Sequence, residues 1–170
     1  YAIFRANGKS QSDALINFIN SESLDDVKTS ALFALSRMRI KEAFPVYENF
    51  LTDGDPFARS LAVRGVGLSD SKDAVRYLLM ALNDADNKVA SQAIASLTNK
   101  ENETVSARLV QKLKQTKDEK IRVDIINALS TRESAEGLEA VYGMLDDELP
   151  INISAATIGY IASVEKDRAV

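Results

Sequence analysis

The sequence contains neither cysteine nor histidine, and these two absences exclude much of the usual chemistry of enzymes. Without cysteine there is no disulfide, no thiolate nucleophile and no thiolate metal ligand. Without histidine there is no Ser-His-Asp triad, no imidazole base and no HExxH zinc site. Only catalytic schemes built on carboxylates, Lys, Tyr or a Ser–Lys pair remain, and we expect a non-catalytic protein that uses no metal and no cofactor.

Other classes of protein are excluded by what the composition lacks. No apolar run approaches the roughly 20 residues of a membrane-spanning helix, so we expect no membrane span. The formal net charge of −4 argues against nucleic acid as a partner, because proteins that bind it usually have a basic surface. With 45% hydrophobic and 27% charged residues, the chain has the composition of a globular protein rather than of a disordered or collagenous one.

What the sequence does contain is an internal repeat. Similar segments begin at Asp25, Asp55, Asn87, Glu119 and Ile151. If the third residue of each segment is taken as an anchor, apolar residues recur four, five and eight positions later, which is one face of an amphipathic helix. The anchors are spaced by 30, 32, 32 and 32 residues, and they are Val27, Phe57, Val89, Ile121 and Ile153. A helix that recurs at a fixed period predicts a stacked-repeat architecture.

A second apolar helical stretch precedes each of these helices, and short polar linkers join the two. The linkers are rich in Asp, Asn, Ser, Gly and Pro, which suits helix ends and N-caps. The pairs Asp53-x-Asp55 and Asp84-x-Asp86 lie in such linkers, and we interpret them as capping residues rather than as calcium ligands. No segment alternates with a period of two, so we expect no strands.

These observations predict an all-α fold, an α-solenoid of five helical hairpins. A single hairpin buries too little apolar surface to fold alone, so neighbouring repeats must share their apolar faces. We expect the repeats to span residues 9–39, 40–68, 70–99, 102–131 and 133–163 of a single domain. Because apolar helical patterns run up to both ends, we also expect the chain to be part of a longer array.

The pattern D-x-V-[KR]-x-x-A-x-x-A-L, which is clearest at Asp25–Leu35, resembles HEAT repeats. The short period resembles the bacterial HEAT-like repeats that also occur in phycobilisome-lyase-like proteins. The resemblance implies that the second helix of each hairpin lines a concave surface, which commonly binds protein partners. It also implies a base directly after the anchor. Lys28 and Arg122 occupy this place, and we expect them to pair with loop acids of a neighbouring repeat.

The face of the second helices opposite the apolar stripe is the first candidate for a binding site. This face lies two, three and six positions after each anchor, and of its fifteen residues only Arg59 and Asp124 are charged. Either concave curvature crowds the helices and favours small residues, or the face contacts a protein. In the second case, apolar anchors and polar residues that fix the register would bind the partner: Phe33, Arg59, Val63, Gln92, Asp124 and Asn127.

A second candidate surface is acidic. Residues 133–165 contain seven acids and no Lys or Arg, so this part of the chain could attract a basic partner. The acids that would form the patch are Glu133, Glu136, Glu139, Asp146, Asp147 and Glu148. A solvated outer helix and its caps would explain the same residues, and we favour this interpretation.

We therefore expect a scaffold that binds a protein or peptide segment, or another domain of its parent chain. One alternative is an accessory arm of a larger bacterial enzyme, such as a peptidase or a prolyl isomerase. The other is a HEAT-like protein that binds nucleic acid. The predicted concave face disfavours the latter, because it supplies Arg59 as its only base.

Overall fold

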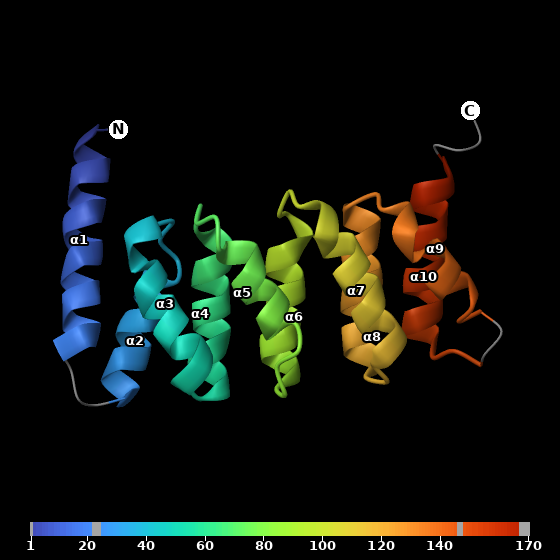
Figure 1. The fold of residues 1–170 in the computed structure, drawn as a ribbon, viewed down its shortest axis with the longest axis horizontal. Coiled ribbons are helices and arrows are strands. Elements are labelled where there is room, and N and C mark those ends of the chain that lie inside the picture. Colours follow the sequence, from blue (N-terminus) through green and yellow to red (C-terminus); the bar gives the residue numbers. More distant parts are fainter. Residues whose placement is uncertain (1, 22–24, 146–147, 167–170) are drawn as a thin grey trace.

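The computed structural model describes residues 2–21, 25–145 and 148–166, and all regular structure in this part of the chain is helical (Figure 1). Two short 3-10 helices, Lys41–Ala43 and Ala135–Gly137, precede the third and ninth α-helices. The α-helices are α1 (Ala2–Ser21), α2 (Asp25–Leu35), α3 (Phe44–Asp53), α4 (Pro56–Leu68), α5 (Ala74–Ala81), α6 (Asn87–Thr98), α7 (Glu103–Gln115), α8 (Glu119–Thr131), α9 (Leu138–Tyr142) and α10 (Ile151–Glu165).

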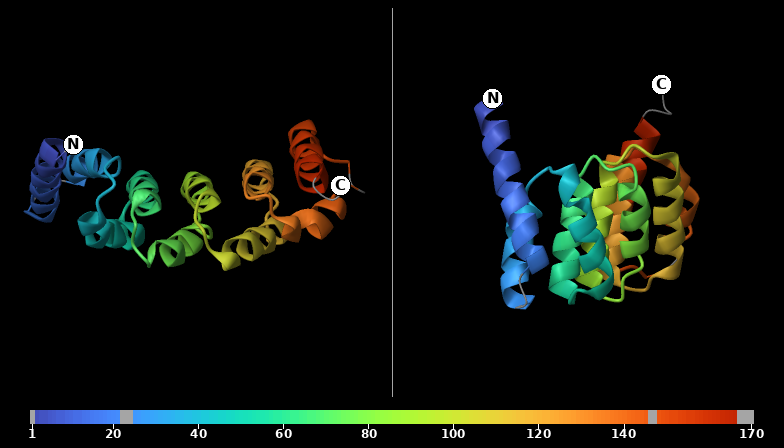
Figure 2. Two further views of the ribbon diagram at one scale, coloured as in Figure 1. Left: turned by 90° about the horizontal axis from the view of Figure 1, so that it is seen from above. Right: turned by 60° about the vertical axis from the view of Figure 1, so that its left-hand side comes forward.

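The helices are arranged as hairpins that follow one another along an arc (Figures 1 and 2). Seen from above, α3, α5, α7 and α9 form an outer row on the convex side, and α2, α4, α6, α8 and α10 form an inner row on the concave side. The structure confirms the predicted α-solenoid, with the second helix of each hairpin inside the curve.

Aspartates in the linkers start the inner helices. Asp55, Asp86 and Asp118 have extended backbones at the N-cap positions of α4, α6 and α8. Their carboxylates accept hydrogen bonds of 2.7–3.3 Å from backbone N–H groups two or three residues further on. Each such cap stabilises its helix by about 1 kcal/mol. The acids of these linkers thus have a structural role at the start of α4, α6 and α8.

The repeats share one hydrophobic core. Leu32, Leu97 and Ile126, each from a different inner helix, are all 0% exposed. The buried residues extend from Ile19 in α1 to Val164 in α10. All element pairs in extensive contact belong to the same repeat or to adjacent repeats. Each repeat is therefore stabilised by its neighbours, as in other solenoids.

The second repeat differs from the sequence prediction by one residue. Its predicted anchor, Phe57, is 60% exposed, whereas Ala58 is 2% exposed. Ala58 follows the cap Asp55 by three residues, just as Val89 follows the cap Asp86. The predicted register of α4 was wrong because the anchor was assigned to the large apolar residue Phe57. The position of the cap Asp55 would have assigned it to Ala58.

Tyr47 ties the first two repeats together. Its ring packs against Gly65 of α4, where an added Cβ would lie only 2.4 Å from the ring. Its hydroxyl donates a 2.8 Å hydrogen bond to the carbonyl of Leu35 at the end of α2. Burial raises the pKa of this hydroxyl to about 12, because the charged phenolate is poorly solvated in the core.

Candidate functional site

Two adjoining hollows open on the concave face. The first, of 530 Å³, lies between α4 and α6 and is closed at one end by the loops that follow α2, α4 and α6. The second, of 310 Å³, lies between α6 and α8. Ala95 of α6 is exposed and lines both hollows, so the two hollows meet at its small side chain. We call these two hollows together the concave groove.

Small side chains bring the inner helices close together at the groove. A Cβ added to Gly67 of α4 would lie 2.4 Å from the hydroxyl oxygen of Ser96 on α6. Crowding therefore accounts for the small residues at this point. It does not fill the groove, because both hollows remain open beside it.

Three of the predicted contact residues line the groove. Gln92 lies in the first hollow, and Asp124 and Asn127 lie in the second. Phe33 is 43% exposed on α2, with the guanidinium of Arg37 at 5.7 Å from the centre of its ring. Phe33 lines neither hollow, so the structure brings together only part of the predicted set.

Val63 is not a surface residue. It is 0% exposed and belongs to the hydrophobic core. In the corrected register Val63 is five residues after the anchor Ala58, where every inner helix from α2 to α8 has a buried residue. The prediction of Val63 as an apolar anchor for a partner is therefore wrong.

The side chain of Arg59 is bound by other residues of the protein and does not face the groove. Its Nε and Nη2 donate hydrogen bonds of 2.8 and 2.9 Å to the two carboxylate oxygens of Asp84, in the loop before α6. Its Nη1 donates to the carbonyl of Gly54 at 2.8 Å. The side chains of Arg59 and Asp84 are only 20% and 13% exposed. The guanidinium of Arg59 holds the pKa of Asp84 below its usual range, because its hydrogen bonds favour the ionised carboxylate.

The corrected register explains this role of Arg59. Arg59 directly follows the anchor Ala58, so it occupies the place of the base that the family resemblance led us to expect. It pairs with a loop acid of the next repeat, as was predicted for bases at this place. Arg122, at the same place in α8, instead donates a 3.0 Å hydrogen bond to the carbonyl of Thr116.

The register also shows which base does face the groove. Arg64 of α4 lies six residues after its anchor, at the position of Ala95 and Asn127 in the next two inner helices. It is half-buried and makes no hydrogen bond or ion pair with any described residue. An alignment on the caps Asp55 and Asp86 would have found Arg64 from the sequence.

Two further cations of the first hollow come from loops. Arg39 follows α2 and Lys100 follows α6, and Asp70 is the only acid among the lining residues. The amine of Lys100 donates a 3.0 Å hydrogen bond to the carbonyl of Ser69. Burial lowers the pKa of Lys100; Arg39 lowers it further by repulsion, whereas Asp70 opposes the shift. The first hollow therefore holds more positive than negative charge.

The second hollow is electrically balanced. The amine of Lys120 lies 2.6 Å from a carboxylate oxygen of Asp124, and the same oxygen accepts a 2.6 Å hydrogen bond from the hydroxyl of Ser91. The side chain of Asn127 is exposed beside this pair and has no hydrogen-bond partner among the described residues. Its amide group can both donate and accept, which suits the backbone of a bound chain.

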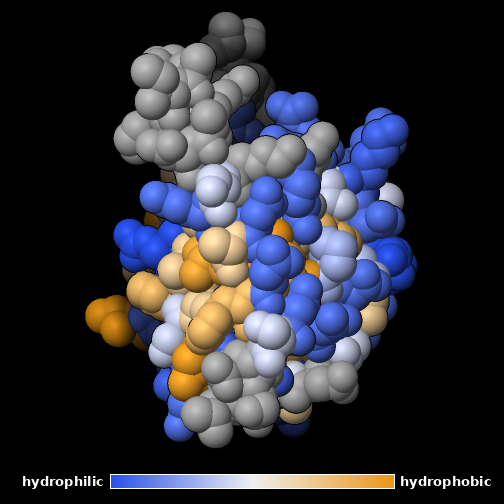
Figure 3. Space-filling model, turned by 90° about the vertical axis from the view of Figure 1, so that its left-hand side faces the viewer, coloured by the Kyte–Doolittle hydropathy of each residue, from blue (hydrophilic) through white to orange (hydrophobic). Residues whose placement is uncertain are grey.

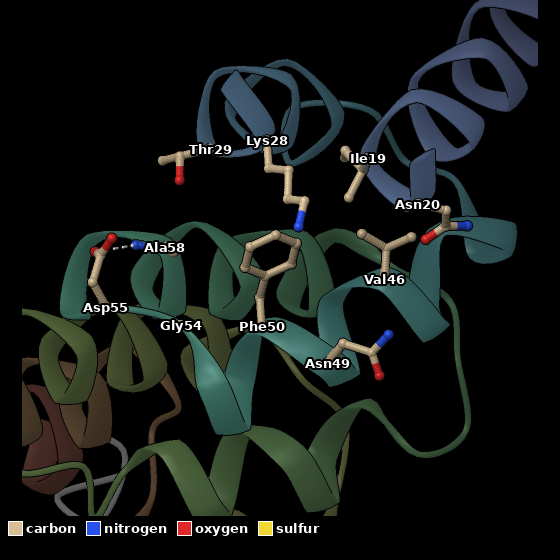
Figure 4. Close-up of a pocket in the computed structure, with 10 residues that line it drawn as sticks. All are labelled: Ile19, Asn20, Lys28, Thr29, Val46, Asn49, Phe50, Gly54, Asp55 and Ala58. Carbon is tan, nitrogen blue, oxygen red and sulfur yellow. Dashed lines mark hydrogen bonds between the residues drawn. The ribbon is translucent and has the colours of Figure 1, made fainter. Parts of the chain in front are cut away.

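A third cavity, of 440 Å³, lies where the first two hairpins meet (Figure 4). Ile19, Val46 and Phe50 form an apolar side, and the side chain of Lys28 extends toward the ring of Phe50. The sequence did not predict this cavity. We assign it no chemistry.

Two other surfaces carry distinctive side chains. The end of the solenoid that begins with α1 shows a hydrophobic patch beside hydrophilic residues (Figure 3), and Phe18 of α1 is 40% exposed. At the other end, Glu133, Glu136, Glu139 and Glu148 of the predicted acidic patch are exposed. Asp146 and Asp147, the other members of that patch, lie outside the described residues.

The described residues also limit the other kinds of site. No group of three or more acids among them is placed to hold a metal ion. None of the described helices has the length and hydropathy of a membrane-crossing segment.

Comparison with known proteins agrees with this architecture. No curated protein matches the chain. The crystal structure of an engineered protein is similar in fold, with a TM-score of 0.60 and 16% identity, over 90% of this chain and 78% of that one. HEAT repeats match residues 12–98 and 78–161, which together span most of the sequence. The chain belongs to the HEAT-repeat family.

Proposed function

We propose that this protein is a non-catalytic scaffold whose concave groove binds a segment of another protein or domain. HEAT repeats generally serve as scaffolds for protein–protein interaction. The observation that carries the proposal is the pair of hollows that meet at Ala95, because together they offer a continuous path across three inner helices.

The groove has the chemistry that a peptide backbone requires. Gln92 and Asn99 in the first hollow and Asn127 in the second carry amide groups that donate and accept hydrogen bonds. The exposed methyl of Ala95 leaves room for a chain to cross α6. The groove is open and shallow, unlike the enclosed cavities that usually hold small ligands.

A photo-crosslinking experiment tests the proposal. A photoreactive phenylalanine analogue is placed at Ala95 in the groove or, as a control, at Met80, which is 58% exposed on α5 of the outer row. Both proteins are irradiated in extract of the source cells. We expect a defined set of cross-linked peptides from position 95 that is absent from position 80.

Competition then shows whether the groove itself binds. Excess unlabelled wild-type protein should abolish the cross-links. Excess Ala95→Phe should not, because the larger ring blocks the groove where the two hollows meet. Equal competition by the two proteins would refute binding in the groove. Cross-links to another domain of the same polypeptide would identify the bound segment as internal, which is the case of an accessory arm.

A further inference from the structure

We infer that the bound segment is acidic and that an Asp or Glu side chain of the partner enters the first hollow, between Arg39, Arg64 and Lys100. This inference rests on the proposed function, because it specifies the chemistry of the segment that the groove binds. It goes beyond the family, since HEAT repeats as a class prescribe no charge for their partners.

The argument begins with the cations that the protein already uses. On the inner row, Arg59 pairs with Asp84, and Lys120 pairs with Asp124. Nη1 of Arg132 donates three hydrogen bonds of 2.8–3.1 Å to backbone carbonyls at the end of α6. These three side chains are satisfied within the protein and are not available to a ligand.

The cations of the first hollow differ from them. Arg39 and Arg64 make no hydrogen bond or ion pair with any described residue, although Arg64 is half-buried. Among the described residues, the amine of Lys100 has one hydrogen-bond partner, the backbone carbonyl of Ser69. Arg39 is exposed, but Arg64 and Lys100 are half-buried, and partly desolvated charges that have no counter-ion are costly. An anion bound between them would remove this cost.

A carboxylate in this hollow would satisfy all three groups. The planar guanidinium of Arg64 can bind a carboxylate with two parallel hydrogen bonds, and such bonds are stronger than those between neutral groups. A negative charge would also favour the protonated amine of Lys100, and so would oppose the lowering of its pKa by burial and by the repulsion from Arg39. Asp70, at the edge of the hollow, is too small a counter-charge to neutralise three cations.

The outer row offers a competing basic surface, but three of its four cations, Lys72, Arg76 and Arg108, are exposed to solvent, whereas Arg64 and Lys100 are half-buried. A hollow of 620 Å³ between α5 and α7 is lined by Lys72, Arg76, Arg108 and Lys112. Arg76 lies 3.8 Å from Asp73 and 4.3 Å from the centre of the Tyr77 ring. Arg108 and Lys112 donate hydrogen bonds to Gln111 and Asn83. The concave hollow is therefore the better site for an anion.

The adjoining hollow favours a peptide over nucleic acid. A nucleic acid presents phosphates at regular intervals and needs a basic stripe along its path. The second hollow offers none, because Asp124 neutralises Lys120. Packed helices lie about 8–10 Å apart and an extended chain rises about 3.3 Å per residue. We thus expect an acidic residue followed or preceded, about three residues away, by a neutral one bound near Asn127.

The test selects random twelve-residue peptides, displayed on phage, that bind the whole protein. The same library is selected against Arg39→Glu/Arg64→Glu, against Ala95→Phe, and against Arg108→Glu, which reverses one charge on the outer row. Circular dichroism verifies that each variant is folded. We expect peptides enriched in Asp and Glu from the wild type and from Arg108→Glu, but not from the other two variants.

Synthetic peptides from the selection give the affinities. Arg64→Glu alone should weaken binding of an acidic peptide about tenfold or more, since it replaces an attraction by a repulsion. A peptide in which the critical Glu is changed to Lys should recover affinity for Arg39→Glu/Arg64→Glu, in which Lys100 is the only base left among the residues that line the hollow. Failure of this charge exchange would overturn the assignment of the carboxylate to the first hollow.

The outcomes separate this inference from the proposed function. Neutral or basic peptides that bind the wild type but not Ala95→Phe would overturn the acidic partner and leave the groove intact. Peptides that bind Ala95→Phe as well as the wild type, or the absence of any selected peptide, would count against the groove itself. Loss of acidic peptides in Arg108→Glu alone would assign them to the outer face. Tighter binding of labelled duplex DNA or RNA than of any peptide would overturn the inference in favour of nucleic acid.

Discussion

The ion pair of Arg59 and Asp84 should be a principal tie between the second and third repeats. Both side chains are at most 20% exposed, and the two hydrogen bonds between them are 2.8 and 2.9 Å long. Hydrogen bonds to charged groups contribute about 1.5–3 kcal/mol, and a bidentate pair lies toward the upper end. The exposed pair of Arg76 and Asp73, at 3.8 Å and more than 60% exposed, should contribute only about 0–1 kcal/mol.

A double-mutant cycle measures this difference. The free energy of unfolding in urea, followed by circular dichroism, is compared for the wild type, Arg59→Met, Asp84→Asn and the double variant at pH 7. We expect a coupling energy of about 2 kcal/mol. The same cycle with Arg76→Met and Asp73→Asn is the control. Equal coupling energies for the two pairs would refute the reasoning.

The pH dependence has a definite sign. Because Arg59 lowers the pKa of Asp84 in the folded protein, the stability that the pair provides is fully present above the pKa of the unfolded chain, about 3.9. It is lost as the pH falls further, through the pKa of the folded protein. The coupling energy should therefore be constant from pH 7 to pH 5 and decline below pH 4. A coupling energy that persists unchanged at the acid limit of folding would contradict this assignment.

Further predictions concern stability, with Gly159 as an exposed control for the buried Gly65. Gly65→Ala should destabilise the protein by about 1–3 kcal/mol in thermal or urea unfolding, because the new methyl group collides with Tyr47. Gly159→Ala should instead stabilise it by about 0.5–1 kcal/mol, because the added Cβ meets nothing within 4 Å. Leu97→Ala should cost about 2–5 kcal/mol, since this side chain is 0% exposed at the centre of the solenoid, and a cost below 1 kcal/mol would contradict a shared core. Burial raises the pKa of Tyr47 to about 12, so the stability that its neutral hydroxyl provides is present below pH 10 and is lost between pH 10 and 12. In urea titrations, the wild type should therefore lose about 3 kcal/mol more stability over this range than Tyr47→Phe does.

The fold could be predicted from the sequence because its signal is local and repeated. Buried residues such as Ile94 and Ile126 recur with a helical period, and capping aspartates such as Asp86 mark where the helices begin. The register failed at Phe57, where a bulky side chain near the helix start resembled an anchor although it is 60% exposed. In the fifth repeat, Ile158 lies five residues after its anchor but is 63% exposed. A capping residue is a better landmark than side-chain size, because it fixes where the first helical turn begins.

The groove could be predicted only in part, for two separate reasons. Gln92, Asp124 and Asn127 lie on regular helices, so their helical positions placed them on the concave side. Because of the one-residue error, Arg59 was predicted to face the groove instead of Arg64, and the core residue Val63 was predicted to be exposed. Arg39 and Lys100 lie in loops, and their approach to Arg64 depends on how three repeats stack.

The restriction of contacts to adjacent repeats has a mechanical consequence. No described element braces the arc from one end to the other, so bending is resisted only at the interfaces between neighbours. Small rotations at successive interfaces add up, so we expect the solenoid to bend elastically under a small force. Its curvature is then an adjustable quantity, and an occupant that spans α4, α6 and α8 would stiffen the middle of the arc while both ends stay compliant.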